Sequence, residues 1–293
     1  MTVHLLLLLA ALAAPAAAHD FWIRPDSFAP APDSPLAVRC FVGEQGVAGE
    51  PVARNDARLL RFELLGRGGR AAARPVVGQD GAEPAGAVRV PDDGAAWVVF
   101  ENTPARLELE AAKFEAYLRE EGLEAILARR AARGESDRPS REVYARCAKA
   151  LLRPGGVVRE SDAAVVLAPV GLRLELLPEA DPETLAFGAD GAELRVRLLF
   201  EGAPLAGALV KATLLAPHGP TGEPAAPAVA LPFSAPAATG LHARTDAHGR
   251  VALRLARGGE WLVTCVHMLA AEGEAATDHD YESLWASLAF AAM

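Results

Sequence analysis

The sequence predicts a mainly β protein in which a β-rich N-terminal domain with a short helical insertion precedes an antiparallel β-sandwich. Three observations lead to this fold class. Short apolar segments separated by Gly- and Pro-rich turns run up to residue 101, the apolar period becomes helical within 111–151, and seven further strand-like segments follow residue 171. With 51% hydrophobic and 23% charged residues among 293, the composition is that of a folded chain long enough for two domains.

The first 18 residues are predicted to be a secretory signal peptide. An apolar run of Leu and Ala covers residues 5–14, and small residues lead up to Ala18. The run is too short to cross a bilayer, which takes about 20 apolar residues. We therefore expect cleavage after Ala18, a periplasmic or secreted location, and a mature chain that begins at His19 and has no transmembrane segment.

The N-terminal domain is expected over residues 19–156 and begins with strand-like segments. The first of these alternates and is stopped by Pro25. The Gly-rich stretch 66–70 is expected to be a hairpin tip rather than a dinucleotide-binding loop, because no helical pattern opens after it. The predicted strands cover 19–23, 36–42, 57–64, 87–90 and 97–101.

A helical segment is predicted over residues 111–151. Apolar residues at i, i+3 and i+4 begin at Phe114 and again at Leu123, which indicates two short helices broken near Gly122. A third helix is expected to begin at Pro139, since proline is favoured in the first helical turn and apolar residues follow at intervals of four. The residues at these intervals are Val143, Cys147 and Leu151.

Seven arginines crowd this region. They could form an anion site, but the acidic residues between them favour solvated helix faces. These arginines are Arg129, Arg130, Arg133, Arg138, Arg141, Arg146 and Arg153.

The stretch 157–171 is predicted to be a linker to a C-terminal β-sandwich over 172–293. Turn signals separate its strand-like segments, and no helical pattern interrupts them. The six prolines of 216–240 predict an extended surface loop there. The predicted strands cover 172–177, 194–200, 208–215, 241–245, 251–255, 261–267 and 284–290.

The charge and cysteine content exclude several classes of protein. A formal net charge of −9 argues against a nucleic-acid partner, which requires clustered positive charge. Three cysteines are too few for a disulfide-stapled miniprotein. One disulfide among Cys40, Cys147 and Cys265 would have three pairings, and the alternative is three buried thiols, which we favour for Cys147.

Three histidines and one aspartate are the candidate metal ligands. As first residue, His19 would offer its α-amino and imidazole nitrogens to one ion, a donor set that suits Cu(II), Ni(II) and Zn(II). His267 ends one predicted strand, and His279 with Asp280 precedes the last, so these side chains could meet at one edge of the sandwich. The alternatives are a histidine exposed by chance and a solvated acidic loop.

Several segments resemble domain-of-unknown-function family 4198, a group of exported bacterial proteins. They are residues 19–25, 113–118 with 121–123, 144–151, 261–268 and 282–288. Some members are similar to periplasmic components of nickel or cobalt uptake systems, and the resemblance implies a transthyretin-like or Ig-like sandwich for the C-terminal half. The segments 201–210 and 245–250 match that sandwich type. The resemblance implies only His19 and His267 as plausible metal ligands. His279 is included on its local spacing alone.

Three functions follow as expectations. The first is an exported protein that binds a divalent transition metal (Ni, Co or Cu) for delivery to a membrane uptake system. The alternative is a structural or interaction module of the cell envelope that binds a protein or glycan partner without metal. Copper-dependent oxidative chemistry is a remote third, because it needs a second histidine opposite the first and an aromatic substrate surface; otherwise no enzyme activity is expected.

Overall fold

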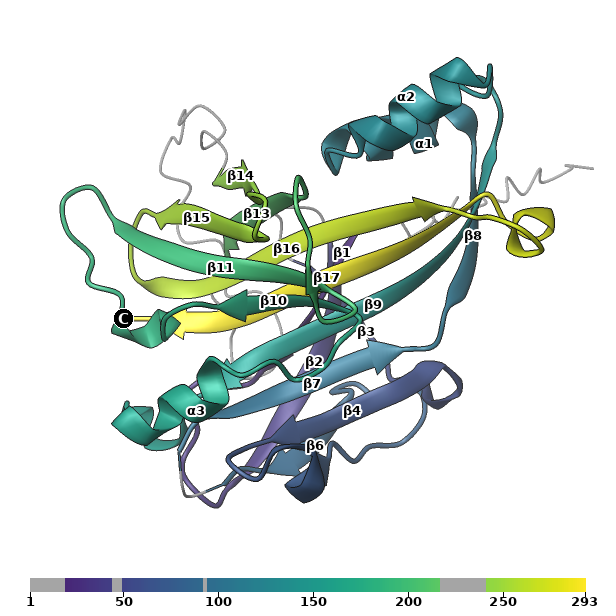
Figure 1. The fold of residues 1–293 in the computed structure, drawn as a ribbon. Coiled ribbons are helices and arrows are strands. Elements are labelled where there is room, and N and C mark those ends of the chain that lie inside the picture. Colours follow the sequence, from purple (N-terminus) through teal and green to yellow (C-terminus); the bar gives the residue numbers. More distant parts are fainter. Residues whose placement is uncertain (1–18, 44–48, 92–93, 217–240) are drawn as a thin grey trace, which may run out of the picture.

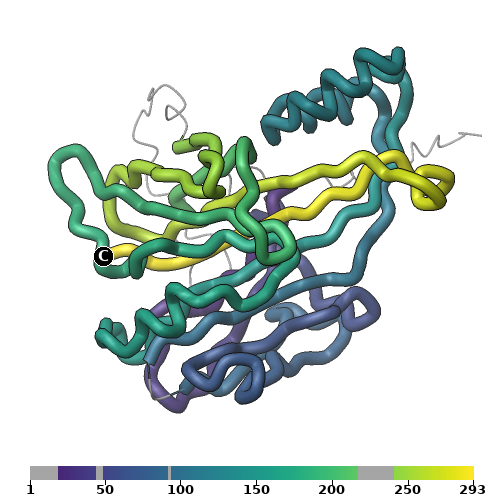
Figure 2. Tube along the Cα trace, in the orientation of Figure 1, coloured from purple at the N-terminus to yellow at the C-terminus, as the bar shows by residue number. Residues whose placement is uncertain are grey.

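The computed structural model describes residues 19–43, 49–91, 94–216 and 241–293, and arranges them in three layers (Figures 1 and 2). A nine-stranded sheet, the central sheet, lies in the middle. A four-stranded sheet containing β1 packs on one of its faces, and a four-stranded sheet containing β11 packs on the other. The predicted leader, residues 1–18, and nearly all of the predicted loop 216–240 lie outside the described residues.

The central sheet combines strands from both halves of the chain. Its two halves are joined by β17 and β9, which run parallel from the pair Tyr281 and Glu142 to the pair Ala289 and Ala150. In sheet order the strands are β14 (His242–Arg244), β13 (Leu209–Leu214), β16 (Gly259–Ala270), β17 (Tyr281–Ala292), β9 (Ser140–Leu152), β7 (Ala96–Asn102), β4 (Leu59–Leu65) and β5 (Arg74–Pro75), with β8 (Ala105–Leu109) also on β9.

The two outer sheets and a helical hairpin cover the central sheet. The β1 sheet contains β1 (Asp20–Pro25), β2 (Pro35–Gly43), β3 (Glu50–Val52) and β6 (Gly86–Arg89). The β11 sheet contains β10 (Leu174–Pro178), β11 (Ala192–Phe200), β12 (Ala203–Pro204) and β15 (Arg250–Leu255). The hairpin consists of α1 (Ala111–Glu120) and α2 (Glu124–Ala132), and a short helix, α3 (Ala163–Val166), follows β9.

The predicted mainly β fold is confirmed, and so are the strands predicted on either side of the helical segment. The C-terminal strands pack as an antiparallel sandwich around one core, to which the central strands β7 and β9 also contribute. The helices at Phe114 and Leu123 are also confirmed. Gly122 has a φ of +65°, a conformation that glycine adopts without strain, and it ends the first helix where the break was expected.

The third predicted helix is wrong, because residues 140–152 form the central strand β9. A spacing of four places Cys147 and Leu151 on one face of a helix, but it does the same in a strand, whose period is two. Ala148, Ala150 and Leu152 are buried as well and face the opposite core. A strand inside a sheet covered on both faces is apolar on both sides, and that pattern mimics a helix.

The stretch 157–171 is packed against the sandwich rather than extended between two bodies. Val165, Val166 and Val170 belong to the sandwich core, and the Val165 carbonyl accepts a hydrogen bond of 3.0 Å from the Trp97 indole. Because β9 and β17 share one sheet, this stretch crosses from one layer to another within a continuous structure.

All three cysteines are buried free thiols, so no disulfide links them. Cys265 and Cys147 both oppose Ala286, one from each side, which places them two strands apart. Strands are spaced about 4.8 Å apart, and the resulting separation of about 10 Å exceeds what a disulfide can bridge. Cys40 lies in the other core, behind the central sheet.

Candidate functional site

The central sheet separates two of the predicted metal ligands. His19 is half-buried directly before β1, and the next residue, Asp20, hydrogen-bonds to Thr264 on the β1 side of strand β16. His267 faces the other side, where its ring packs on Phe200 with centroids 4.7 Å apart. Burial lowers the pKa of His267, because a charged imidazolium is disfavoured away from water.

His279 and Asp280 lie in the connection between β16 and β17, and both are engaged by neighbouring charges. His279 Nδ1 lies 3.2 Å from Asp278 Oδ2, and its Nε2 lies 3.3 Å from Glu282 Oε1. Asp280 pairs with the Arg141 guanidinium at 2.9 Å. Among the described residues, no three His, Cys, Asp or Glu side chains are grouped as a metal site.

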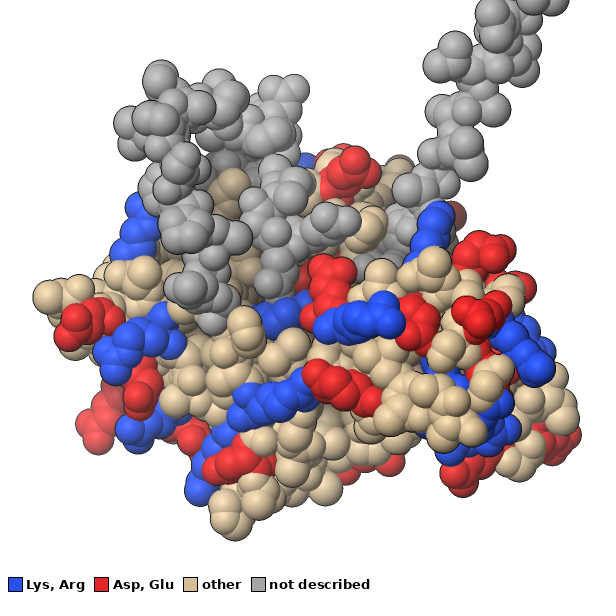
Figure 3. Space-filling model, turned by 90° about the horizontal axis from the view of Figure 1, so that it is seen from above, with Lys and Arg blue, Asp and Glu red and all other residues tan. Residues whose placement is uncertain are grey.

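A groove with a volume of about 540 Å³ opens between the helical hairpin and β13–β14, close to the start of β1. Lys211 lines it, and His242 lies directly opposite Lys211 in the strand pairing, so both side chains belong to the same face. We call this the terminal groove. Its other lining residues are Arg119, Glu120, Gly122, Glu124, Leu209, Ala243 and Arg244. Figure 3 shows acidic and basic side chains interspersed over the face of the molecule seen from above.

Two buried carboxylates share one ammonium group beneath the terminal groove. Lys211 Nζ lies 2.6 Å from Glu121 Oε2, and its charge also acts on Asp20. Burial raises the pKa of Glu121 to about 7 against the opposing effect of Lys211, and the charge of Asp20 adds to the rise. Burial likewise raises the pKa of Asp20. This cluster therefore has one negative charge more than its lysine balances, so it favours a proton or another cation beside His19.

The positions of the few lysines are a sequence signal for this cluster, although the lysine content alone does not reveal it. Only three lysines occur among 29 basic residues, a scarcity that reads as coding bias. Two of them, Lys149 and Lys211, are buried in ion pairs on strands, and each interrupts an apolar run. A lysine inside such a run needs a buried acidic partner, which the sequence alone does not identify.

A second buried polar cluster lies where α1 covers the central sheet. The Glu142 carboxylate accepts hydrogen bonds from the hydroxyls of Tyr117, at 3.3 Å, and Ser283, while the Trp285 indole donates to Ser283 at 3.1 Å. Burial raises the pKa of Glu142 to about 7. Both of the bonds that Glu142 accepts end on its Oε1, while its Oε2 is buried without a hydrogen-bond partner among the described residues. The bond from Tyr117 links α1 to strand β9 of the central sheet.

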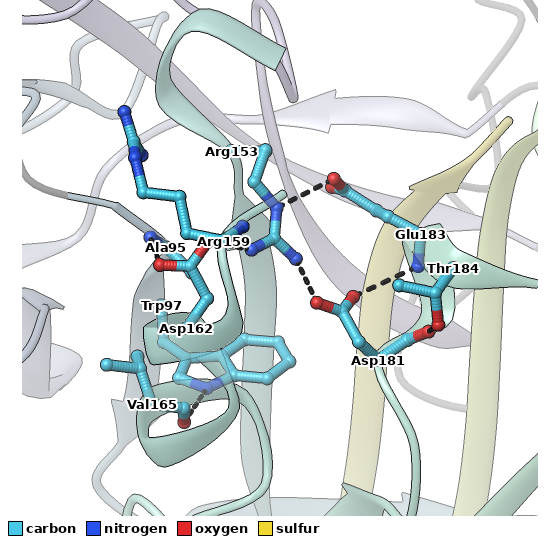
Figure 4. Close-up of polar contacts among 9 residues, drawn as sticks. All are labelled: Ala95, Trp97, Arg153, Arg159, Asp162, Val165, Asp181, Glu183 and Thr184. Atoms are coloured by element: carbon cyan, nitrogen blue, oxygen red, sulfur yellow. Dashed lines mark hydrogen bonds and ion pairs between the residues drawn. The ribbon is translucent and has the colours of Figure 1, made fainter. Parts of the chain in front are cut away.

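Arg153 forms a buried clasp with three carboxylates (Figure 4). Its guanidinium contacts Asp162 at 2.5 Å, Asp181 at 2.5 Å and Glu183 at 2.8 Å. The clasp ties the end of β9 to the segments before and after β10. Arg153 and Arg130 are both buried, so the expectation that the seven arginines lie on solvated helix faces is wrong for these two. Arg130 is held by Glu115 at 3.1 Å and stacks over Phe114.

The structure contains no helix, among its described residues, that is long and apolar enough to cross a membrane. No curated protein matches the chain. Two solved structures are similar over most of its length. The D0-D1 domain of intimin is 12% identical with a TM-score of 0.21, covering 92% of this chain and 97% of that one. A mutant of Salmonella alpha-2-macroglobulin is 10% identical with a TM-score of 0.19, covering 94% of this chain and 15% of that one. Likenesses this low carry no argument about function.

The family comparison is more extensive. The model of a domain of unknown function, DUF4198, matches residues 16–269, which is most of the chain. That match covers the resembling segments 19–25, 113–123, 144–151 and 261–268, while the segment 282–288 lies beyond it. The chain belongs to the DUF4198 family.

Proposed function

We propose that the chain is exported, is cleaved after Ala18, and binds one divalent transition-metal ion at its new N-terminus for delivery to an uptake system. The observation that carries this proposal is that two buried carboxylates, Asp20 and Glu121, gather around one ammonium group, Lys211, at the start of β1, directly after His19 in the chain. A cation at that terminus restores the balance of charge that Lys211 alone leaves incomplete.

The position of the terminus supports the same proposal. Every residue of β1 is buried, and the strand is paired along its whole length with β2 from Asp20 to Pro25. The α-amino and imidazole nitrogens of His19 would therefore be held at a fixed place by the folded body, which lowers the entropic cost of chelation. Glu120, whose charge acts on Asp20, and His242 of the terminal groove would be the additional donors.

The proposed donor set differs from the one expected from the sequence. His267 faces the sandwich side of the central sheet, while His279 and Asp280 are occupied by Asp278, Glu282 and Arg141. These three residues therefore have no part in the proposed site. Nitrogen donors from the terminus, joined by one carboxylate or imidazole, suit nickel, cobalt or copper better than calcium or magnesium.

Calorimetric titration of the cleaved protein with Ni(II), Cu(II) and Zn(II) tests the proposal. We expect saturable binding of one ion, lost in His19→Ala and weakened in His242→Ala. His267→Ala and His248→Ala are the matched controls, because their rings lie away from the groove, and they should bind as the wild type does. Absence of saturable binding would leave the alternative function, a metal-free interaction module of the cell envelope with a protein or glycan partner.

A further inference from the structure

A second pocket opens where α2 ends, between the loop that leads to β9 and the connection from β16 to β17 (Figure 1). Its volume is about 180 Å³, smaller than the roughly 300–1,000 Å³ of pockets that hold drug-sized ligands. The terminal groove lies at the other end of the hairpin, beside Gly122, and shares no lining residue with it. We call this pocket the arginine pocket, because four of the seven arginines of this region line it: Arg129, Arg130, Arg133 and Arg138.

Arg130 is the fixed base of the arginine pocket. Its side chain is only 2% exposed, and its Nε donates to Glu115 at 3.1 Å. Its Nη2 donates to the backbone carbonyls of Glu135 and Arg138, each at 2.8 Å. Because one buried guanidinium holds both carbonyls, the loop 133–139 has a fixed position. The pocket is therefore built before any ligand arrives, which lowers the entropic cost of binding.

The two acidic residues that line the arginine pocket already have arginine partners. Glu135 pairs with Arg133 at 2.8 Å. Asp280 pairs with Arg141, a residue outside the lining, at 2.9 Å, and also accepts a bond of 2.8 Å from the Arg141 backbone N–H. Among the described residues no other aspartate or glutamate lines this pocket. The charges of Arg130 and Arg133 are thus balanced by Glu115 and Glu135.

Arg129 and Arg138 are the two lining arginines that no ion pair balances within the described ranges. Both side chains are exposed, and neither contacts a carboxylate there. Burial raises the pKa of Tyr281, while its bond with Arg130 and the charges of Arg130 and Arg129 oppose the rise, so Arg129 acts on the buried wall of the pocket. The arginine pocket therefore has two guanidinium groups available to an anion.

We propose that the arginine pocket binds a divalent tetrahedral oxyanion of the phosphate type, held by Arg129 and Arg138. The planar fork of a guanidinium matches two oxygens of a phosphate, and two such groups balance its two charges. The small volume, with Tyr281 as the one aromatic residue of the described lining, suits a compact polar ligand rather than a flat apolar one. Free phosphate and the terminal group of a phosphate monoester share this chemistry. The site is independent of the metal site proposed above.

Calorimetric titration of the protein with inorganic phosphate, in a buffer free of metal ions, tests this proposal. We expect saturable binding of one phosphate, with nitrate, a planar monoanion, at least about tenfold weaker, since one charge-assisted hydrogen bond corresponds to about that factor. Glycerol 3-phosphate distinguishes the two sources. If it binds as tightly as phosphate, the pocket accepts a monoester; if it binds about tenfold more weakly, the pocket is specific for the free ion. Either result supports a site for the phosphate group.

Arg129→Gln and Arg138→Gln should each weaken phosphate binding about tenfold, and the double variant should lose saturable binding. Both side chains are exposed, so these variants should keep the fold, which circular dichroism checks. Arg195→Gln is the matched control, because this arginine is 67% exposed on β11 and lines neither site; it should bind phosphate as the wild type does.

Arg138→Lys separates charge from geometry, because lysine keeps the charge but loses the planar fork. Its binding should be weaker than that of the wild type and tighter than that of Arg138→Gln. Absence of saturable phosphate binding, nitrate binding as tight as that of phosphate, or a folded double variant that binds phosphate like the wild type would overturn the proposal. His19→Ala should bind phosphate normally, which separates this result from the outcome of the metal titration.

Discussion

Lys211 on β13 and Glu121 at the end of α1 form a buried ion pair, with the ammonium nitrogen 2.6 Å from a carboxylate oxygen. The pair links the C-terminal half of the chain to the helical hairpin of the N-terminal half. It also lies beside Asp20, so the start of β1, the hairpin and the edge of the central sheet meet at one cluster of charges. This cluster underlies the metal site that we propose.

Replacing Lys211 by methionine should destabilise the protein by about 3–5 kcal/mol, since it leaves two carboxylates buried without a cation. This loss of stability should become smaller as the pH falls, because protonated carboxyl groups no longer need a counter-charge. Urea unfolding at neutral and acidic pH measures both effects. Lys113→Met, on an exposed position of α1, is the control and should change the free energy of unfolding by less than about 0.5 kcal/mol. A similar loss in both variants would contradict this role of Lys211.

Glu142→Gln should flatten the pH dependence of stability. The folded pKa of Glu142 is about 7, above its ordinary value of 4.5, so the folded protein holds the proton more tightly than the unfolded chain. Its contribution to stability is therefore complete below about pH 4.5 and is lost as the pH rises through about 7. Glutamine keeps the neutral form at every pH, and above neutrality the variant should be more stable by up to about 3 kcal/mol. Chemical unfolding of both proteins across this pH range measures how the free energy of unfolding depends on pH. Parallel pH profiles for the variant and the wild type would contradict the raised pKa of Glu142.

Arg153→Met should lower the free energy of unfolding by at least as much as Lys211→Met does, because three carboxylates would lose their shared guanidinium. Breaking a buried ion pair from one side costs about 3–5 kcal/mol. Thermal unfolding compares this variant with Arg89→Met, whose side chain is 62% exposed in its pair with Asp33 and should matter little. If Arg153→Met unfolds at the same temperature as the wild type, the clasp does not hold the segments around β10.

The two halves of the chain should not fold separately. Since β9 and β17 are parallel neighbours in one sheet, fragments 19–156 and 172–293 would each expose a long unpaired strand edge. We expect the intact protein to unfold in one cooperative transition, and each fragment to lack fixed tertiary structure by near-ultraviolet circular dichroism and NMR. Two well-separated transitions, or a folded fragment, would show that the halves are independent domains.

Most of the secondary structure could be predicted from the sequence because it depends on local patterns. Alternation marked the strands, and the spacing at Phe114 and Leu123 marked the two helices. The failure at β9 has a physical cause: a strand covered on both faces has no polar side, so the spacing of Cys147 and Leu151 fits either period. The parallel pairing of β9 with β17 joins residues about 140 positions apart, and no local signal specifies it.

The candidate site was predictable only at its first residue. The position of His19 after a leader-like segment points to a terminal chelate, but its neighbours come from distant parts of the chain. Glu121 and Lys211 act on Asp20, the residue after His19, and His242 lies opposite Lys211 in the strand pairing. The spacing of His267, His279 and Asp280 suggested proximity along the chain, yet strand alternation turns His267 to the far side of the sheet from Asp20.

Electron paramagnetic resonance of the Cu(II)-loaded protein tests the central claim most directly. A chain that begins at His19 should show copper coordinated by at least two nitrogens, one from the α-amino group and one from the imidazole. The same protein with its α-amino group acetylated should lose that spectrum, because the acylated nitrogen can no longer bind the metal as an amine. Identical spectra from the two proteins, or no bound copper in the protein that begins at His19, would contradict the account.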